Sequence, residues 1–255
     1  MTDQAHHWSR VAASYEKEFV DPYLPDVRRP LFDALQRLAG KQYTVADLGC
    51  GTGPLLPWLA ERFGRVIAVD FAAGMLERAR QRCAGLTNVE FVQANLTDLA
   101  ALVGQVDVAA AVNSLVMPDV RDLERGLRQI RAALRPAGRL VGIVPAIDGV
   151  HYFTMLLLDR ALTTGMPLDK ARQNAAHHAE HELYDFAFGE FHYRGLEQHF
   201  WQPFEVHYRL RRAGFRRVRL AKVLLSWQQF GCPDKFKDQA PPWDWFFAAA
   251  CSPAE

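Results

Sequence analysis

The chain has 255 residues, a formal net charge of +1 and 49% hydrophobic residues, which is ordinary for one α/β domain carrying an insertion. The balanced charge gives no global reason to expect a nucleic-acid or membrane partner, so a small molecule is the expected partner. Four scattered cysteines without a CxxC pair argue against a disulfide framework or a zinc ribbon and are typical of a reduced, cytoplasmic protein.

The N-terminal segment MTDQAHHWSR lacks the basic and apolar regions of a secretory signal. No apolar run approaches the roughly 20 residues that span a bilayer. Two helices are expected first, over residues 5–19 and 26–40, and Gly40 is expected to cap the second.

From Tyr43 the pattern alternates between short apolar strands and amphipathic helices. Strands are expected at 43–48, 65–70, 88–94, 105–113 and 138–144, and helices at 54–64, 73–85 and 120–136. Strands without strict polar alternation are typical of a parallel sheet buried on both faces. The alternation of strands and helices predicts a doubly wound sheet.

The alternation stops after Val144 for about sixty residues, which is long for a connection. Helices are expected at 148–165 and 167–188, whereas 189–202 fits no element. A helix at 203–215 and strands at 216–226 and 243–251 complete the chain. We expect a single domain over residues 1–255: a Rossmann-like, seven-stranded, mostly parallel sheet with an antiparallel last strand, N-terminal helices in 1–40 and a helical insertion at 146–202.

The glycine-rich stretch VADLGCGTGPL, residues 45–55, follows the first expected strand. A dinucleotide fingerprint needs G-x-G-x-x-G, but counting from Gly49 places Pro54 at the sixth position. Proline suits the first turn of a helix but removes an N–H group that would face a phosphate, and Asp47 would repel one. The stretch therefore favours a cationic or zwitterionic ligand.

VADLGCGTG, VIAVDFAAGML, FVQANLTDL and LRPAGRLV occur in the order of the motifs of class I S-adenosylmethionine-dependent methyltransferases, which this chain resembles. The resemblance covers about residues 8–145, resumes at LRRAGFRRVRL and is silent on the insertion. It implies the class I methyltransferase fold and S-adenosylmethionine as cofactor. The implied reaction moves a methyl group to an oxygen, nitrogen or carbon of a small, partly apolar acceptor and leaves S-adenosylhomocysteine.

The resemblance assigns roles around the cofactor. Asp47 is expected to accept from the ammonium group, directly or through water, and Asp70 to accept from both ribose hydroxyls. Asn95 is expected beside the adenine, with Leu96 and Met75 covering the ring. The full set of expected cofactor residues is Tyr15, Asp47, Gly49, Cys50, Gly51, Gly53, Asp70, Met75, Asn95, Leu96 and Asn113.

Three of these residues also suit purely structural roles. Asp70 can cap the following helix, Asn95 can form a turn, and Tyr15 can belong to the packed face of its helix. Sequence alone leaves both interpretations open.

The strand end VNSLVMPD lacks the acidic or amide residue followed by two prolines and an aromatic that marks methylation of nucleic-acid bases. Instead, the insertion is expected to form a lid over the acceptor. Its His and aromatic residues are candidates for the pocket wall: His151, Tyr152, Phe153, Tyr184, Phe186, Phe188, Phe191, His192, Tyr193, Phe200 and Trp201. If the acceptor loses a proton, the candidate bases are His151, His192 and Tyr193.

Other features carry weaker hypotheses. His177 and His181 are spaced to hold zinc on one helix face, but HExxH order and a third ligand are missing, and no metal is expected. The basic run RLRRAGFRRVRL suits a solvated surface better than a nucleic-acid contact. Two other functions stay open: a non-catalytic binding subunit that keeps the fold, and an NAD-dependent oxidoreductase, which Pro54 disfavours.

Overall fold

The computed structural model describes residues 8–9, 22–24, 29–193, 195–230, 232 and 234–252. The predicted cofactor residue Tyr15 and most of the expected helix 5–19 lie outside the described residues. The expected helix 26–40 is represented by α3, Leu31–Leu38. Gly40 does not cap it: the helix ends at Leu38, the cap residue Ala39 is extended, and Gly40 is the first residue of a strand.

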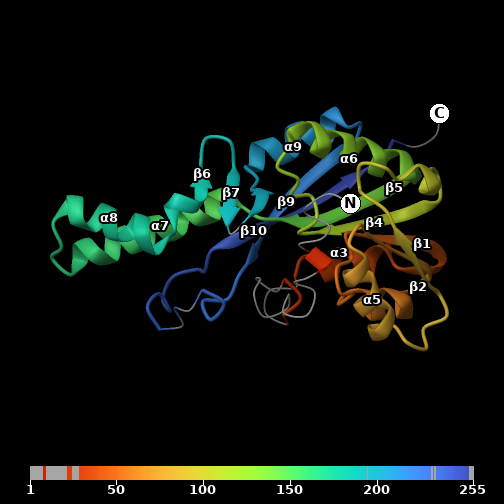
Figure 1. The fold of residues 1–255 in the computed structure, drawn as a ribbon, viewed down its shortest axis with the longest axis horizontal. Coiled ribbons are helices and arrows are strands. Elements are labelled where there is room, and N and C mark those ends of the chain that lie inside the picture. Colours follow the sequence, from red (N-terminus) through yellow and green to blue (C-terminus); the bar gives the residue numbers. More distant parts are fainter. Residues whose placement is uncertain are drawn as a thin grey trace.

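The centre of the fold is a seven-stranded sheet in the order β3-β2-β1-β4-β5-β10-β9 (Figure 1). Its strands are β1 Gly40–Leu48, β2 Phe63–Asp70, β3 Val89–Gln93, β4 Val106–Val112, β5 Leu134–Val144, β9 Arg216–Leu224 and β10 Trp243–Ala250. Strands β1 to β5 are parallel, and β10 runs antiparallel to both β5 and β9. The predicted mostly parallel sheet with an antiparallel last strand is confirmed.

Successive residues of the central strands pack on opposite faces of the sheet, as the pleat requires. In β1, Val45 belongs to the core cluster with α3, α4 and α5, whereas Ala46 belongs to the cluster with α6 and α9. These helices are α4 Leu56–Arg62, α5 Ala73–Arg82, α6 Val120–Ala133 and α9 Pro203–Arg212. Figure 1 shows α6 and α9 on one side of the sheet and α3 and α5 on the other. Both faces are covered, which explains the apolar strands.

The predicted insertion holds two helices and a small sheet. Helices α7, Ile147–Thr163, and α8, Leu168–His178, form an arm that extends beyond the main sheet (Figure 1). After α8 a short 3-10 turn, η2, covers His181–Leu183. The three-stranded sheet β6-β7-β8 consists of β6 Tyr184–Asp185, β7 Glu190–Tyr193 and β8 Leu196–His199.

The expected helix 167–188 is therefore too long. The observed helix α8 ends at His178. Two residues later Glu180 has a left-handed backbone conformation, φ 53°, which is incompatible with a continuing right-handed α-helix. The chain then enters β6 and the β7-β8 hairpin, neither of which the sequence pattern predicted. The arm is completed by the connection between β9 and β10, because Trp227 and Phe236 pack with Phe153 and Leu156 of α7.

Candidate functional site

A cavity lies at the carboxyl ends of the parallel strands, where ligands bind in open α/β sheets. The turn after β1 forms one wall, and it is held in place because the Gly49 and Cys50 N–H groups both donate to the Val69 carbonyl. The lining residues are Trp8, Gly49, Gly51, Asp70, Phe71, Met75, Ala94, Asn95, Leu96, Val112, Asn113, Ser114, Val116, Met117, Glu197 and Gln198. We call it the loop cavity.

The three glycines of the loop have different reasons to be glycine. A Cβ on Gly51, whose φ is 54°, would meet no atom within 4 Å, so this backbone borders open space in the cavity. A Cβ on Gly49 would lie 2.3 Å from the Cβ of Ser114, and one on Gly53 would lie 3.0 Å from the Cβ of Ala79. Gly51 leaves room for a ligand, whereas Gly53 admits helix α5 and does not line the cavity.

Asp70 ends β2, as predicted, and lines the loop cavity; its ribose-binding role stays a prediction. Its Oδ2 accepts the Gly51 N–H at 2.9 Å and its Oδ1 accepts the Ala72 N–H at 2.9 Å. Burial raises the pKa of Asp70, and these backbone N–H groups oppose the rise. A carboxylate offers about four acceptor positions, so capacity remains for two hydroxyls. Asp70 thus fixes the loop and still fits the predicted role.

Asp47 lies in β1 behind the loop and does not line the cavity. It is 2% exposed, and its Oδ2 has no hydrogen-bond partner among the described residues. Burial, and then the charge of Asp70, raise the pKa of Asp47 to about 7. A buried carboxylate oxygen without a donor suits a cationic group, because such a group would supply the missing counter-charge. The neighbouring Cys50 is also buried and does not line the cavity.

The predicted adenine residues Met75, Asn95 and Leu96 all line the loop cavity. Asn95 Oδ1 accepts from the Thr97 backbone N–H at 2.9 Å and from the Thr97 hydroxyl at 3.0 Å. The side-chain oxygen of Asn95 therefore has the turn-forming role of the alternative interpretation. The amide nitrogen carries the two hydrogens that an adenine ring nitrogen can accept. Asn95 is compatible with both roles at once.

A second cavity of about 400 Å³ adjoins the first, and we call it the acceptor cavity. The two cavities share Trp8, Asn113, Val116 and Gln198. The remaining walls of the acceptor cavity are Pro145, Ala146, Gly149, Val150, Phe153, His178, Ala179, Glu180, Tyr184, Phe200, Leu225, Gln229, Phe230, Pro242, Trp243 and Asp244. Three of the aromatic residues predicted for the pocket wall therefore reach it: Phe153, Tyr184 and Phe200.

Asn113 stands where the cavities meet. It follows β4 in a left-handed conformation, φ 50°, and its Oδ1 is buried without a hydrogen-bond partner among the described residues. Non-glycine residues in this conformation are uncommon and are found at functional sites. Its side chain is therefore available to groups that span the two cavities.

The candidate bases His151, His192 and Tyr193 line neither cavity. His151 is exposed and its ring contacts Phe186, whereas His192 is exposed between Glu190 and Glu197. Tyr193 is 41% exposed. Their catalytic role stays a prediction, and no contact with either cavity supports it.

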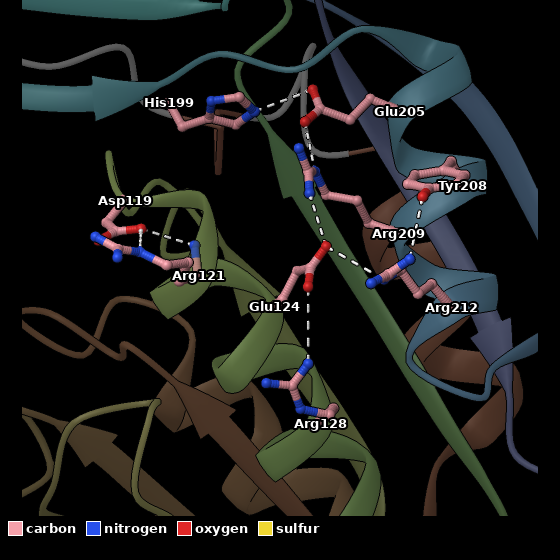
Figure 2. A network of polar contacts seen from close by, with 9 residues as sticks. All are labelled: Asp119, Arg121, Glu124, Arg128, His199, Glu205, Tyr208, Arg209 and Arg212. Carbon is pink, nitrogen blue, oxygen red and sulfur yellow. Dashed lines mark hydrogen bonds and ion pairs between the residues drawn. The ribbon is translucent and has the colours of Figure 1, made fainter.

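A buried polar network fixes β8 beside both cavities (Figure 2). His199 and Glu205 are joined at 3.0 Å, and Arg209 links Glu205 to Glu124 of α6. Burial alone would raise the pKa of Glu205, but His199 and then Arg209 hold that pKa below its usual range. The His199 N–H donates to the Val116 carbonyl at 2.9 Å, so the network holds the preceding Gln198 against the loop after β4.

Trp201 makes a second anchor. It is fully buried, its Nε1 donates to the Leu115 carbonyl at 2.7 Å, and its backbone N–H donates to the Pro145 carbonyl at 2.8 Å. The insertion is thereby tied to the loops after both β4 and β5. Trp201 was a candidate for the pocket wall, and the structure uses it as core instead.

Sequence reasoning missed several lining residues. Gln198 and Glu197 belong to the segment that fitted no element, and Trp8 was interpreted only as part of a packed helix face. Asp244 could have been found from the sequence, because it is a carboxylate between two tryptophans in the otherwise apolar strand WDWFFAAA. Buried carboxylates are rare unless paired or functional.

His177 and His181 do not share a helix face as predicted, because α8 ends at His178 and His181 lies in the 3-10 turn η2. The described residues contain no group of three His, Cys, Asp or Glu side chains that would hold a metal ion. His181 instead lies 2.8 Å from the Thr154 hydroxyl.

Within the described part of the chain, no helix combines the length and apolar character needed to cross a bilayer.

Comparisons with known proteins find methyltransferases. Residues 45–138 match the family model described as a methyltransferase domain. A demethylmenaquinone methyltransferase from Clavibacter sepedonicus is 38% identical over 108 residues, 42% of each chain. The predicted resemblance to methyltransferases is confirmed. The match spans 42% of that relative's length, so the similarity does not show that this chain has the relative's activity.

Solved structures show the fold. An S-adenosylmethionine-dependent methyltransferase from Mesorhizobium loti superposes with a TM-score of 0.61 at 21% identity, covering 89% of this chain and 98% of that one. The DhpI-SAH complex superposes with a TM-score of 0.59 at 20% identity, covering 98% and 96%. The chain has the class I methyltransferase fold, as the sequence predicted.

Proposed function

We propose that the protein transfers a methyl group from S-adenosylmethionine to a small, partly apolar acceptor. The observation that carries the proposal is the pair of adjoining cavities. Seven of the eleven predicted cofactor residues line the loop cavity, and the acceptor cavity has aromatic walls. Two connected sites are what a two-substrate transfer requires.

When bound, S-adenosylmethionine supplies a methyl group already activated on a sulfonium sulfur, so the protein has to orient the acceptor and exclude water. Asp70 would hold the ribose hydroxyls, Asp47 would balance the ammonium charge, and Met75 and Leu96 would cover the adenine. Asn113 Oδ1, buried at the junction of the cavities, would orient the reacting groups.

The character of the acceptor cavity supports an aromatic acceptor. Phe153, Tyr184, Phe200, Phe230 and Trp243 contribute ring surface to its walls. The Clavibacter relative is named for demethylmenaquinone, a quinone, which agrees with such a pocket. All four cysteines are free and buried, which supports a reducing, cytoplasmic location.

The test is a thermal-shift titration with S-adenosylhomocysteine and with NAD. A ligand that binds only the folded state raises its apparent stability, so we expect a shift with S-adenosylhomocysteine alone. Asp70→Asn should weaken this binding about tenfold or more, because one of its two accepting oxygens becomes a donor. Asp122→Asn, on the exposed side of α6, is the matched control.

The two other hypotheses predict different outcomes. Stabilisation by NAD and not by S-adenosylhomocysteine would show an oxidoreductase site. Binding of S-adenosylhomocysteine without transfer of labelled methyl groups to any naphthol, phenol or amine would favour the non-catalytic binding subunit.

A further inference from the structure

A buried carboxylate lies in the wall of the acceptor cavity. Asp244 is the second residue of β10 and is 7% exposed. Because β10 runs antiparallel to β5, with Trp245 opposite Val144, the first residues of β10 lie at the carboxyl end of β5. Asp244 therefore lies at the same edge of the sheet as the loop cavity.

One oxygen of Asp244 is fixed and the side chain lines the cavity. Oδ1 accepts the Ala146 N–H at 3.3 Å, which sets the orientation of the carboxyl group. Burial raises the pKa of Asp244 to about 7, and the Ala146 N–H opposes the rise. A carboxylate with a pKa near neutrality accepts a proton far better than one with an ordinary pKa, while still ionising at working pH.

The other charged groups around Asp244 do not neutralise it. The described ionisable residues that share the cavity wall are His178, Glu180 and Tyr184, and no Lys or Arg is among them. Burial, then the charges of Glu180 and Asp244, hold the pKa of Tyr184 above its usual range, so it stays a neutral phenol.

Outside the cavity wall, Lys222 of the adjacent strand lies over the Trp243 ring, 3.2 Å from its centroid. Asp148 of α7 accepts the indole N–H groups of Trp243 and Trp245. These contacts fix the two tryptophans on either side of Asp244. The carboxyl groups in the cavity wall itself are those of Asp244 and Glu180, which disfavours an anionic acceptor.

We propose that Asp244 binds the hydroxyl group of a neutral aromatic acceptor and takes its proton during methyl transfer. This inference rests on the proposed function. The acceptor oxygen bonds to the methyl carbon as the methyl–sulfur bond breaks, and the electron pair of that bond stays on sulfur. The O–H proton moves to the Asp244 carboxylate, which becomes a carboxylic acid and later releases the proton to water. The same carboxylate repels acceptors that carry a carboxylate of their own.

Binding tests the inference without turnover. The probes are 2-naphthol, 2-methoxynaphthalene and 2-naphthoate, which share one ring system but carry a hydroxyl, a methyl ether and a carboxylate. Calorimetry at pH 8 with S-adenosylhomocysteine present should show 2-naphthol binding on the order of tenfold tighter than the ether, as a hydrogen bond to a charged group implies. We expect 2-naphthoate to bind weakest.

The pH dependence of the wild-type protein gives a second readout. As Asp244 becomes protonated below about pH 7, the preference for 2-naphthol over the ether should fall several-fold. Because His178 and Glu180 share the cavity, the same titration is repeated with Asp244→Asn, in which the change should disappear.

Substitutions separate Asp244 from its neighbours. Asp244→Asn keeps an oxygen for the Ala146 N–H, and it should lose most of the 2-naphthol preference and gain affinity for 2-naphthoate. Asp159→Asn, on the exposed surface of α7, also removes one negative charge, and it should change neither the preference for 2-naphthol nor the affinity for 2-naphthoate. If Glu180→Gln abolishes the preference instead, or if wild-type protein binds naphthol and ether equally at pH 8, the inference is wrong.

The proposed function is judged separately, by S-adenosylhomocysteine stabilisation of Asp244→Asn, which should equal that of the wild type and also shows that the variant folds. If the wild type methylates a hydroxylated aromatic, Asp244→Asn should lower kcat by a factor on the order of 10² to 10⁴. The ionisation near pH 7 should also disappear from the dependence of the rate on pH. Retained activity and profile would contradict the role of Asp244.

Discussion

Replacing Asp47 by asparagine should stabilise the protein while weakening its binding of S-adenosylhomocysteine. The pKa of Asp47 rises from 3.8 to about 7 in the folded state. A raised carboxyl pKa means that the folded state holds the proton more tightly than the unfolded state, so stability falls as pH rises from about 4 to 7. A difference of roughly three pKa units corresponds to about 4 kcal/mol of lost stability at pH 8.

Asparagine cannot ionise, so Asp47→Asn should recover up to about 4 kcal/mol at pH 8 and about two fifths of that at pH 5, where the folded protein keeps Asp47 protonated. Urea unfolding of both proteins at the two pH values measures the difference. Asp122→Asn, at an exposed position, should show no such pH dependence. An equal gain at both pH values, or a loss at pH 8, would refute the explanation that burial of an ionised Asp47 destabilises the fold.

Three further predictions follow from the site. Gly51→Ala, at φ 54° beside open space, should cost about 1 kcal/mol of stability and weaken S-adenosylhomocysteine binding several-fold, measured by calorimetry. Glu205→Gln should destabilise by about 3–5 kcal/mol at pH 7, and because the pKa of Glu205 is lowered, the difference in urea unfolding should vanish as pH falls below its usual 4.5. Trp201→Phe should cost about 1–3 kcal/mol, because the buried Leu115 carbonyl loses its donor; unchanged thermal stability would contradict that role.

The sheet was predictable because its signals are local. Each strand buried on both faces leaves a short apolar run, and each helix leaves an amphipathic one, so β1 to β5 and α4 to α6 follow the sequence pattern closely. The positions of Gly51 and Asp70 were predictable for the same reason, since each lies where a strand passes into the following helix: Gly51 between β1 and α4, and Asp70 at the end of β2, before α5.

The insertion was less predictable because short strands and long apolar helices give weak periodic signals. The alternation is visible in EFHY but not in LEQH, and Gly195, φ 82°, lies between the paired residues Tyr193 and Leu196 as a tight hairpin requires. A helical pattern running past His178 concealed where the helix stops. The stop depends on Glu180 adopting a left-handed conformation, to which local propensity gives no clue.

Three aspartates now distinguish the carboxyl edge of the sheet. Asp47, Asp70 and Asp244 are all buried there, and burial raises the pKa of each. Each raised pKa costs stability at neutral pH, and a sequence selected for folding alone would replace such residues. The cost is offset if a cation meets Asp47, hydroxyls meet Asp70 and an acceptor proton meets Asp244. The three carboxylates whose burial costs stability in the free protein are therefore the groups that the two proposed substrates would satisfy.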